Sequence, residues 1–267
     1  MAVGLAVLAA GDVNPEVFAV GGLENQLIEV GVVLKEVEPL TGGFEVGMPL
    51  VDVINFMDGI NGITAGYSLA VLVPLALVNG SGFLDEPSDK VERMVQGSSR
   101  INELENSFID QSYLIVAIIG VLVFSIFNFR PKGKAKCFAG DVGSVGIGFI
   151  MLFAIGRLIM KTGDVTWLVL LLVYGVDGIL TICHRVMLHE HIGQAHRKHA
   201  YQIMANELKM PHLVVSGIYM GLQAVCCAVY IAWPGYPAFF AIFGVLIVMY
   251  LAFMKKYYHL HVKFTKE

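Results

Sequence analysis

The feature that most constrains this chain is a series of apolar runs, each close to the length that crosses a lipid bilayer. The chain has 267 residues, of which 56% are hydrophobic. A helix needs about 20 apolar residues to span the hydrocarbon core, and the length varies with tilt. The sequence therefore predicts an all-α fold, a polytopic membrane bundle with about six transmembrane helices. The expected spans are 63–78, 113–129, 145–160, 165–183, 213–233 and 237–254.

Basic side chains between these runs predict the orientation of the bundle. They gather after the second run, after the fourth and after the sixth, so the three regions alternate correctly to lie on one side. An excess of Lys and Arg marks the cytoplasmic side. We therefore expect the carboxyl terminus and these regions to face the cytoplasm. The basic residues are Arg130, Lys132, Lys134 and Lys136; Arg185, Arg197, Lys198 and Lys209; and Lys255, Lys256, Lys263 and Lys266.

The first 47 residues differ in composition from the rest. Between residues 11 and 47 there are seven acidic side chains against Lys35 alone, which is too polar for a bilayer span. We therefore divide the chain into an atypical acidic segment, 1–47, and one transmembrane domain, 48–267. The net charge of −4, without a basic tail, argues against nucleic acid as a partner. The four cysteines lack the paired spacing of a disulfide framework or a zinc ribbon.

A first polar block, VINFMDGINGITAGYS, occupies residues 53–68. Asn55, Asp58 and Asn61 are spaced by three, which would place them on one side of a helical turn. Glycines among them allow close backbone approach. Two interpretations stay open, a helix start capped by Asp and Asn and a ligand site.

A second block, FNFRPKGKAKCFAGDVGS, occupies residues 127–144. Asp141 and Ser144 precede an apolar helix, so either could be its N-cap. A glycine-rich helix start also suits a phosphate group. Alternatively, the carboxylate could hold Mg²⁺, which binds through one or two carboxylates plus substrate phosphates. Asn128 and Phe138 flank this position, and the nearby lysines would attract a polyphosphate.

The third block, AHRKHAYQ, occupies residues 195–202 in a histidine-rich region. His196, Arg197 and His199 fall within one turn, where Arg can hold phosphate and His can donate to it or move a proton. A zinc site is a rival interpretation, and a basic loop that meets anionic lipid is another. A fourth signal is Asp177, because a carboxylate inside an apolar run either serves a site or has a structural partner.

Together the three blocks resemble the polyprenyl-phosphate N-acetylhexosamine-1-phosphate transferases. INFMDGINGITAGYS resembles that family's Asn-x-x-Asp-Gly-x-(Asp/Asn)-Gly signature. FNFRPKGKAKCFAGDVGS resembles its Asn-x-x-Pro and Phe-x-Gly-Asp-x-Gly-Ser block, and AHRKHAYQ resembles the His/Arg block of its bacterial polysaccharide branch. The resemblance covers about residue 48 to the carboxyl terminus.

The resemblance implies a multi-pass protein of the bacterial inner membrane with a cytoplasm-facing active-site cleft. It implies transfer of a sugar-1-phosphate, N-acetylglucosamine-1-phosphate by the nearest likeness, from a UDP-N-acetylhexosamine to undecaprenyl phosphate. UMP would be released, and the lipid product would feed cell-envelope polysaccharide synthesis. The implied cofactor is Mg²⁺, with Mn²⁺ as a substitute. Whether the chain forms a homo-oligomer stays open.

The resemblance also assigns roles to individual residues. Asp141 is the implied metal ligand, Phe138 lies near the uracil, and the His/Arg block lies near the diphosphate. The implied catalytic residues are Asp58, Asp141, His196 and His199. The implied substrate-binding residues are Asn55, Asn61, Asn128, Phe138, Gly140 and Arg197.

One departure from the family pattern opens alternatives. The family carries an adjacent Asp-Asp pair on an earlier helix, and this sequence has no two adjacent aspartates. The resemblance therefore predicts that the amino-terminal part of the domain is missing or degenerate. One alternative function is a catalytically inactive or truncated homologue that binds a nucleotide sugar. A further alternative is a secondary transporter, suggested by Asp177 and by glycine-broken helices.

Overall fold

A computed structural model describes residues 54–80, 107–189 and 197–263, with side chains described as far as Tyr257. All of them belong to one compact unit, Val51–Glu267. Their secondary structure is helical, without a strand in the described ranges. The acidic segment 1–47 lies outside the described residues, so its separation from the transmembrane domain stays a prediction.

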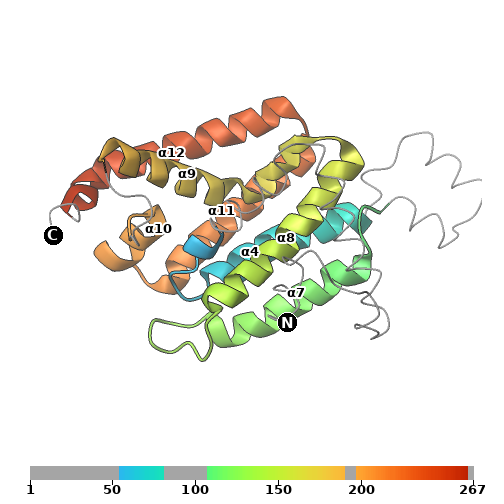
Figure 1. The fold of residues 1–267 in the computed structure, drawn as a ribbon, viewed down its shortest axis with the longest axis horizontal. Coiled ribbons are helices and arrows are strands. Elements are labelled where there is room, and N and C mark those ends of the chain that lie inside the picture. Colours follow the sequence, from blue (N-terminus) through green and yellow to red (C-terminus); the bar gives the residue numbers. More distant parts are fainter. Residues whose placement is uncertain (1–53, 81–106, 190–196, 264–267) are drawn as a thin grey trace, which may run out of the picture. The chain divides into compact units, whose positions relative to one another are not determined.

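Six helices are long and apolar enough to cross a membrane, which confirms the predicted polytopic bundle. The fourth span begins as a 3-10 helix, η2, and continues as α9. The third span starts earlier than predicted, so that Asp141 lies inside its first turn. The spans are α4 (Ile63–Gly80), α7 (Gln111–Asn128), α8 (Gly140–Thr162), η2 (Val165–Leu171) with α9 (Leu172–Met187), α11 (His212–Ala232) and α12 (Tyr236–Lys263) (Figure 1). The short α10 (Ala200–Gln202) and the π-helix η3 (Ile203–Glu207) lie between α9 and α11.

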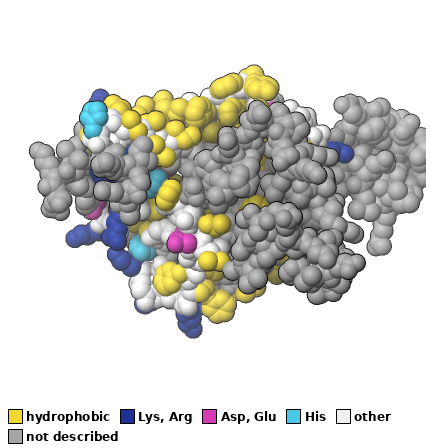
Figure 2. Space-filling model, in the orientation of Figure 1, with side chains coloured by type: hydrophobic (Ala, Val, Ile, Leu, Met, Phe, Trp, Pro, Cys, Tyr) yellow, Lys and Arg dark blue, Asp and Glu magenta, His cyan; other side chains and the backbone are white. Residues whose placement is uncertain are grey.

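The helix α4 is the centre of the described bundle. It packs against α7, α8 and α11, and 61% of it is buried, against 17% of α7. The outward side chains of α7 are apolar, as Val116 and Ile126 show with exposed fractions of 67% and 61%. Figure 2 shows hydrophobic side chains along the edge where α12 runs. Exposed apolar surface of this kind suits contact with lipid, so the chain is a multi-pass membrane protein.

Deep in the bundle, Gln223 satisfies backbone groups where η2 changes into α9. Its Nε2 donates to the Val169 carbonyl at 3.0 Å, and its Oε1 accepts from the Val173 N–H at 3.3 Å. Oε1 also accepts from the Tyr67 hydroxyl at 2.9 Å, and the Tyr67 ring stacks on Tyr174. Backbone groups left unpaired in an apolar interior cost several kcal/mol each. The glutamine therefore permits the change of helix type inside a membrane span.

Hydrogen bonds at both ends of α4 show how the helices run. Asn79 donates to Gln111 at 2.7 Å at one end, and Asn128 accepts from the Gly62 N–H at 2.8 Å at the other. The helices α4 and α7 are therefore antiparallel, and the same end holds the start of α8 and of α11. In Figure 2 the Lys, Arg and His side chains gather toward the end where Figure 1 places α10. The membrane side that this end faces stays a prediction.

Candidate active site

The first predicted block is an irregular turn rather than one helical face. Residues 54–56 form a single helical turn, after which the chain leaves helical geometry until α4 begins. Gly62 ends the turn with a φ of 84°, a left-handed conformation that glycine adopts at little cost. A Cβ at that position would lie 2.4 Å from the Phe129 ring. Both the backbone conformation and the close packing therefore require glycine here.

Asn61 and Asn128, two predicted substrate-binding residues, hold the loops of the site together. The Asn61 Nδ2 donates to two carbonyls of the loop after α7, at 2.9 and 3.1 Å. The Asn128 Nδ2 donates to the Cys137 carbonyl at 2.9 Å, while its Oδ1 accepts from the Gly62 N–H. Both asparagines are buried. The structure thus shows them fixing backbone segments, and direct contact with substrate stays a prediction.

Asp58 and Asp141 come from different blocks and lie close enough to interact electrostatically. The Thr64 hydroxyl donates to Asp58 Oδ1 at 2.5 Å. Burial is the main reason that the pKa of Asp58 is raised to about 6, and the negative charge of Asp141 raises it as well. The Thr64 hydrogen bond and a backbone contact with Gly140 act in the opposite direction. Asp141 is exposed in the first turn of α8, so the first two blocks bring two carboxylates together.

A hydrogen bond joins the same two blocks beside these carboxylates. The fully buried Ser144 hydroxyl donates to Asn55 Oδ1 at 2.5 Å. The N-cap of α8 is Ala139, which makes no side-chain capping bond. The capping interpretation therefore fails for both Asp141 and Ser144. The Asp141 carboxylate lies at the start of the helix without being used to cap it.

The two other predicted residues of the second block lie on the loop that enters α8. Gly140 has a φ of 59°, again in the left-handed region. Phe138 has an exposed fraction of 70%. An aromatic ring in that position can stack on a planar base. The contact between Phe138 and uracil stays a prediction.

The third block is divided between described and undescribed residues. His196 lies outside the described residues, so its place in the site stays a prediction. Arg197 is exposed, whereas Lys198 and His199 are buried at 5% and 3% exposure. Among the basic side chains in the described part of this block, Arg197 is therefore the one that is open to an anionic ligand.

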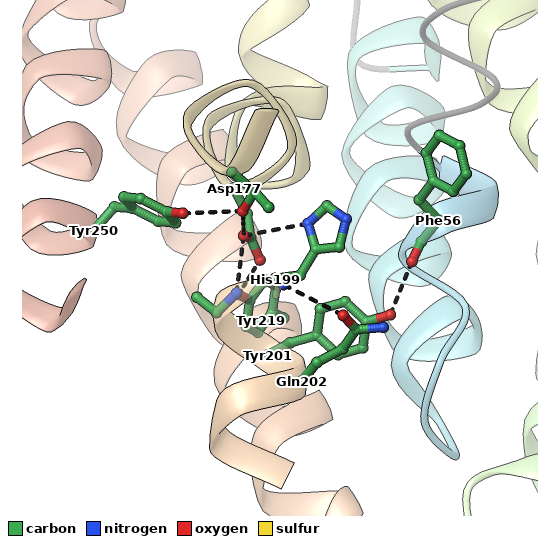
Figure 3. Close-up of polar contacts among 9 residues, drawn as sticks. Phe56, Asp177, His199, Tyr201, Gln202, Tyr219 and Tyr250 are labelled. Carbon is green, nitrogen blue, oxygen red and sulfur yellow. Dashed lines mark hydrogen bonds and ion pairs between the residues drawn. The ribbon is translucent and has the colours of Figure 1, made fainter. Parts of the chain in front are cut away.

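Tyr201 connects the third block to the first. Its hydroxyl donates to the Phe56 carbonyl at 2.8 Å (Figure 3). A Cβ on Gly59 would lie 2.4 Å from the Tyr201 oxygen, so this glycine makes room for the tyrosine. Burial raises the pKa of Tyr201, and the charges of Asp177 and Asp58 raise it too. The hydroxyl is therefore protonated and able to donate at neutral pH.

Asp177 lies at the centre of a second polar network (Figure 3). Its Oδ2 accepts from the Tyr219 hydroxyl at 2.6 Å. Its Oδ1 accepts from the Ala200 N–H at 3.0 Å and from the Thr181 hydroxyl at 3.1 Å. The same oxygen lies 3.5 Å from His199 Nδ1. The costly carboxylate noticed in the sequence is thus satisfied internally, and its partners include the third block.

Thr64, Ser144 and Tyr201 contribute to the site but were absent from the predicted site residues. Tyr201 lies within the His/Arg block, so its neighbourhood was visible in the sequence. Thr64 carried no comparable signal, because its role depends on the irregular turn that brings it against Asp58. The site therefore combines backbone-fixing asparagines, a carboxylate pair and a docked His/Arg block at one end of the bundle.

The described residues fit magnesium better than zinc. Within them, no group of three or more His, Cys, Asp or Glu side chains could hold a metal ion. Structural zinc sites need four such ligands, and catalytic sites need three. Magnesium needs only one or two carboxylates, because substrate phosphates and water complete its shell. Asp141 beside Asp58 matches that requirement.

Comparison with known protein families gives a match over more than half of the chain. The model of the family described as glycosyl transferase family 4 matches residues 2–159. The matched range includes the acidic segment and both carboxylate-bearing blocks, and it ends within α8 before the His/Arg block. No curated protein matches the chain.

Proposed function

The chain belongs to glycosyl transferase family 4, and from that membership we propose that it makes a lipid-linked sugar in the bacterial inner membrane. The family supports transfer of a sugar-1-phosphate to a polyprenyl phosphate in general. The finer proposal is transfer of N-acetylglucosamine-1-phosphate from UDP-N-acetylglucosamine to undecaprenyl phosphate. An acceptor phosphate oxygen forms a bond to the sugar-bearing phosphorus. The bond from that phosphorus to the bridging oxygen breaks, and UMP leaves with the electron pair.

The observation that carries the proposal is the meeting of Asp58 and Asp141. They come from separate blocks, and the raised pKa of Asp58 reflects in part the charge of Asp141. Two carboxylates held this close repel each other, so their arrangement favours a bound cation. Phosphoryl transfer requires positioning and neutralisation of charge more than covalent help from the protein. This carboxylate pair is suited to that task.

We propose Asp141 as the Mg²⁺ ligand, with Asp58 as its neighbouring carboxylate. When bound, the ion would neutralise charge on the donor diphosphate. Asp141 is exposed and makes no capping bond, so its oxygens are accessible from the end of the bundle. Mn²⁺, which also accepts carboxylate and phosphate oxygens, would substitute.

The chain's other groups would bind and orient the substrates. Arg197 is exposed and presents a fork that matches phosphate. Phe138 would stack on the uracil, and the turn at Asn55 would border the nucleotide. The lysines of the loop after α7 add positive charge that attracts a polyphosphate. The acceptor is a lipid phosphate, and a site at the end of a membrane bundle is where its head group would lie.

The direct test is synthesis of the lipid-linked product. Purified full-length protein in lipid is incubated with UDP-N-acetylglucosamine, undecaprenyl phosphate and Mg²⁺, and the lipid fraction is analysed by mass spectrometry. We expect undecaprenyl diphosphate carrying one N-acetylhexosamine, with UMP in equal amount. The same assay with UDP-N-acetylgalactosamine as the sole donor, compared by the rate of UMP release, identifies the preferred donor. If the folded protein forms no such product under these conditions, the proposed activity is wrong.

A matched pair of variants tests the assignment of the metal ligand. Asp141→Asn removes the proposed ligand, whereas Asp110→Asn removes the carboxylate that caps α7 at the other end of the bundle. We expect Asp141→Asn to lower turnover by at least about 100-fold, on the scale of a lost transition-state contact. Asp110→Asn should retain most of the turnover. Equal turnover in the two variants would contradict the assignment.

The absence of adjacent aspartates from the sequence favours a second candidate, a homologue that binds the donor without transferring it. Binding of UDP-N-acetylglucosamine, measured by calorimetry, separates the two. Saturable, Mg²⁺-dependent binding without any UMP release supports this second function. Binding together with UMP release supports the transferase.

A further inference from the structure

Asp177 is a buried carboxylate to which the proposed reaction gives no direct part. It has an exposed fraction of 3% and lies within the span formed by η2 and α9. A charge in that position is costly unless the surroundings compensate for it. Its partners come from three separate places, namely its own helix, α11 and the His/Arg block. Such a carboxylate can control how these segments are placed relative to one another.

We propose that Asp177 is a positioning residue that holds the described part of the His/Arg block, residues 197–202, in the place where it can meet the donor diphosphate. The inference rests on the proposed transferase function. Asp177 itself contacts neither substrate nor metal in this proposal. It acts through His199 and through the backbone of Ala200.

The two oxygens of the Asp177 carboxylate contact different parts of the structure, one the His/Arg block and the other α11. Oδ1 accepts from the Ala200 N–H at 3.0 Å and lies 3.5 Å from His199 Nδ1. Oδ2 accepts from the Tyr219 hydroxyl of α11 at 2.6 Å. Thr181 donates to Oδ1 from the same helix at 3.1 Å. One oxygen therefore holds the block, and the other fixes the carboxylate to the neighbouring helix.

Tyr201 couples the position of the His/Arg block to that of the first block, residues 53–68. Its ring packs against His199, with centroids 5.9 Å apart, and against Tyr219 at 6.2 Å. Its hydroxyl donates to the Phe56 carbonyl and fills the space that Gly59 leaves. A shift of the block away from Asp177 would therefore also disturb the turn that carries Asp58.

Three variants separate positioning from simple stabilisation. Asp177→Asn keeps the size of the side chain but removes its charge and one acceptor oxygen. Tyr219→Phe removes only the bond to Oδ2. Thr166→Val is the matched control, because Thr166 is a buried hydroxyl in the same span that bonds to Tyr230 and Asp164 at the far end. All three are compared as folded protein in lipid, with melting temperatures recorded.

The first readout is the kinetics of transfer. We expect Asp177→Asn to lower kcat about 30-fold with little change in the KM for UDP-N-acetylglucosamine, on the scale of a lost hydrogen bond to a charged group. Tyr219→Phe should lower kcat less than about threefold, and Thr166→Val should leave it unchanged. If kcat falls equally in Asp177→Asn and Tyr219→Phe, in step with melting temperature, Asp177 is only a structural anchor and the proposal is overturned.

The second readout is independent of activity. Lys198 is buried at 5% exposure, so trypsin can cleave after it only when the block leaves the bundle. Lys134, exposed in the loop after α7, gives a reference rate in the same molecule. We expect Asp177→Asn to raise cleavage after Lys198 about tenfold relative to Lys134. Tyr219→Phe should raise it less than about threefold.

The protease comparison also separates the two proposals. If the wild-type protein shows no transfer, the proposed function fails, and cleavage alone decides the role of Asp177. A faster cleavage after Lys198, relative to Lys134, in Asp177→Asn would still support the positioning role. Equal protection of Lys198 in wild type and Asp177→Asn would overturn it.

Discussion

Asp58, which is half-buried, and Asp177, which is buried, lie at the same end of the bundle with different surroundings. Asp177 accepts hydrogen bonds from Tyr219, Ala200 and Thr181 and lies beside His199. Asp58 accepts from the Thr64 side chain, has a backbone contact with Gly140 and has another carboxylate for a neighbour. The chain thus surrounds the buried Asp177 carboxylate with donors and leaves the half-buried Asp58 carboxylate beside a like charge.

This difference in surroundings indicates different roles for the two aspartates. A carboxylate saturated with protein donors is already compensated and serves to hold segments together. A carboxylate that burial and a like charge both disfavour gains most from an incoming cation or proton. The arrangement is consistent with a structural role for Asp177 and a ligand-directed role for Asp58 and Asp141. Four experiments can break or sharpen this contrast.

The largest expected difference is in stability. Asp177→Ala leaves three donors without their acceptor, so we expect it to lower the free energy of unfolding by about 3 kcal/mol or more. Asp58→Ala should cost less than about 1 kcal/mol at pH 7, because it also removes a disfavoured charge. Both are measured by unfolding in mixed detergent micelles. Equal losses in the two variants would erase the contrast.

Cation binding should show the reverse order. In the presence of UDP, Asp141→Asn and Asp58→Asn are each expected to weaken Mn²⁺ binding about tenfold or more, equivalent to about 1.4 kcal/mol. Asp177→Asn should change it less than about twofold, because its oxygens already have protein partners. Electron paramagnetic resonance of free Mn²⁺ gives the affinities. Weaker binding in Asp177→Asn alone would show that the wrong carboxylate had been assigned.

The sequence predicted the bundle well because hydropathy reports directly on a membrane span. The six spans were found within a few residues, although the 3-10 start of the fourth depends on Gln223, which lies on another helix. The spacing of Asn55, Asp58 and Asn61 suggested one shared helical face. Instead, the chain forms an irregular turn that ends at Gly62. Each of the three side chains therefore bonds to a different segment. The pairing of Asp58 with Asp141 joins two helix starts, and such contacts are not encoded in local periodicity.

The pH dependence of stability is a third way to test the contrast. The pKa of Asp58 is raised in the folded chain, so folding favours its protonated form. Its contribution to stability is therefore full below the unfolded pKa of about 3.8 and is lost as the pH rises through about 6. Without divalent cations, wild type should lose about 1–2 kcal/mol more than Asp58→Asn between pH 5 and pH 7. If the free energy of unfolding depends on pH in the same way in the two proteins, the pKa of Asp58 is not raised in the folded chain.

The smallest expected effects concern the individual causes of the Asp58 shift. The Thr64 hydrogen bond lowers the pKa of Asp58 and the charge of Asp141 raises it. Thr64→Val should therefore raise the pKa further, and Asp141→Asn should lower it, each by about half a unit to one unit. The carbonyl band of the protonated acid, followed by infrared spectroscopy and identified by its loss in Asp58→Asn, gives the titration. Shifts of opposite sign in the two variants would establish that the carboxylates sense each other in the metal-free protein. A shift of the same sign in both would show that a general change in the turn, rather than these two contacts, sets the pKa.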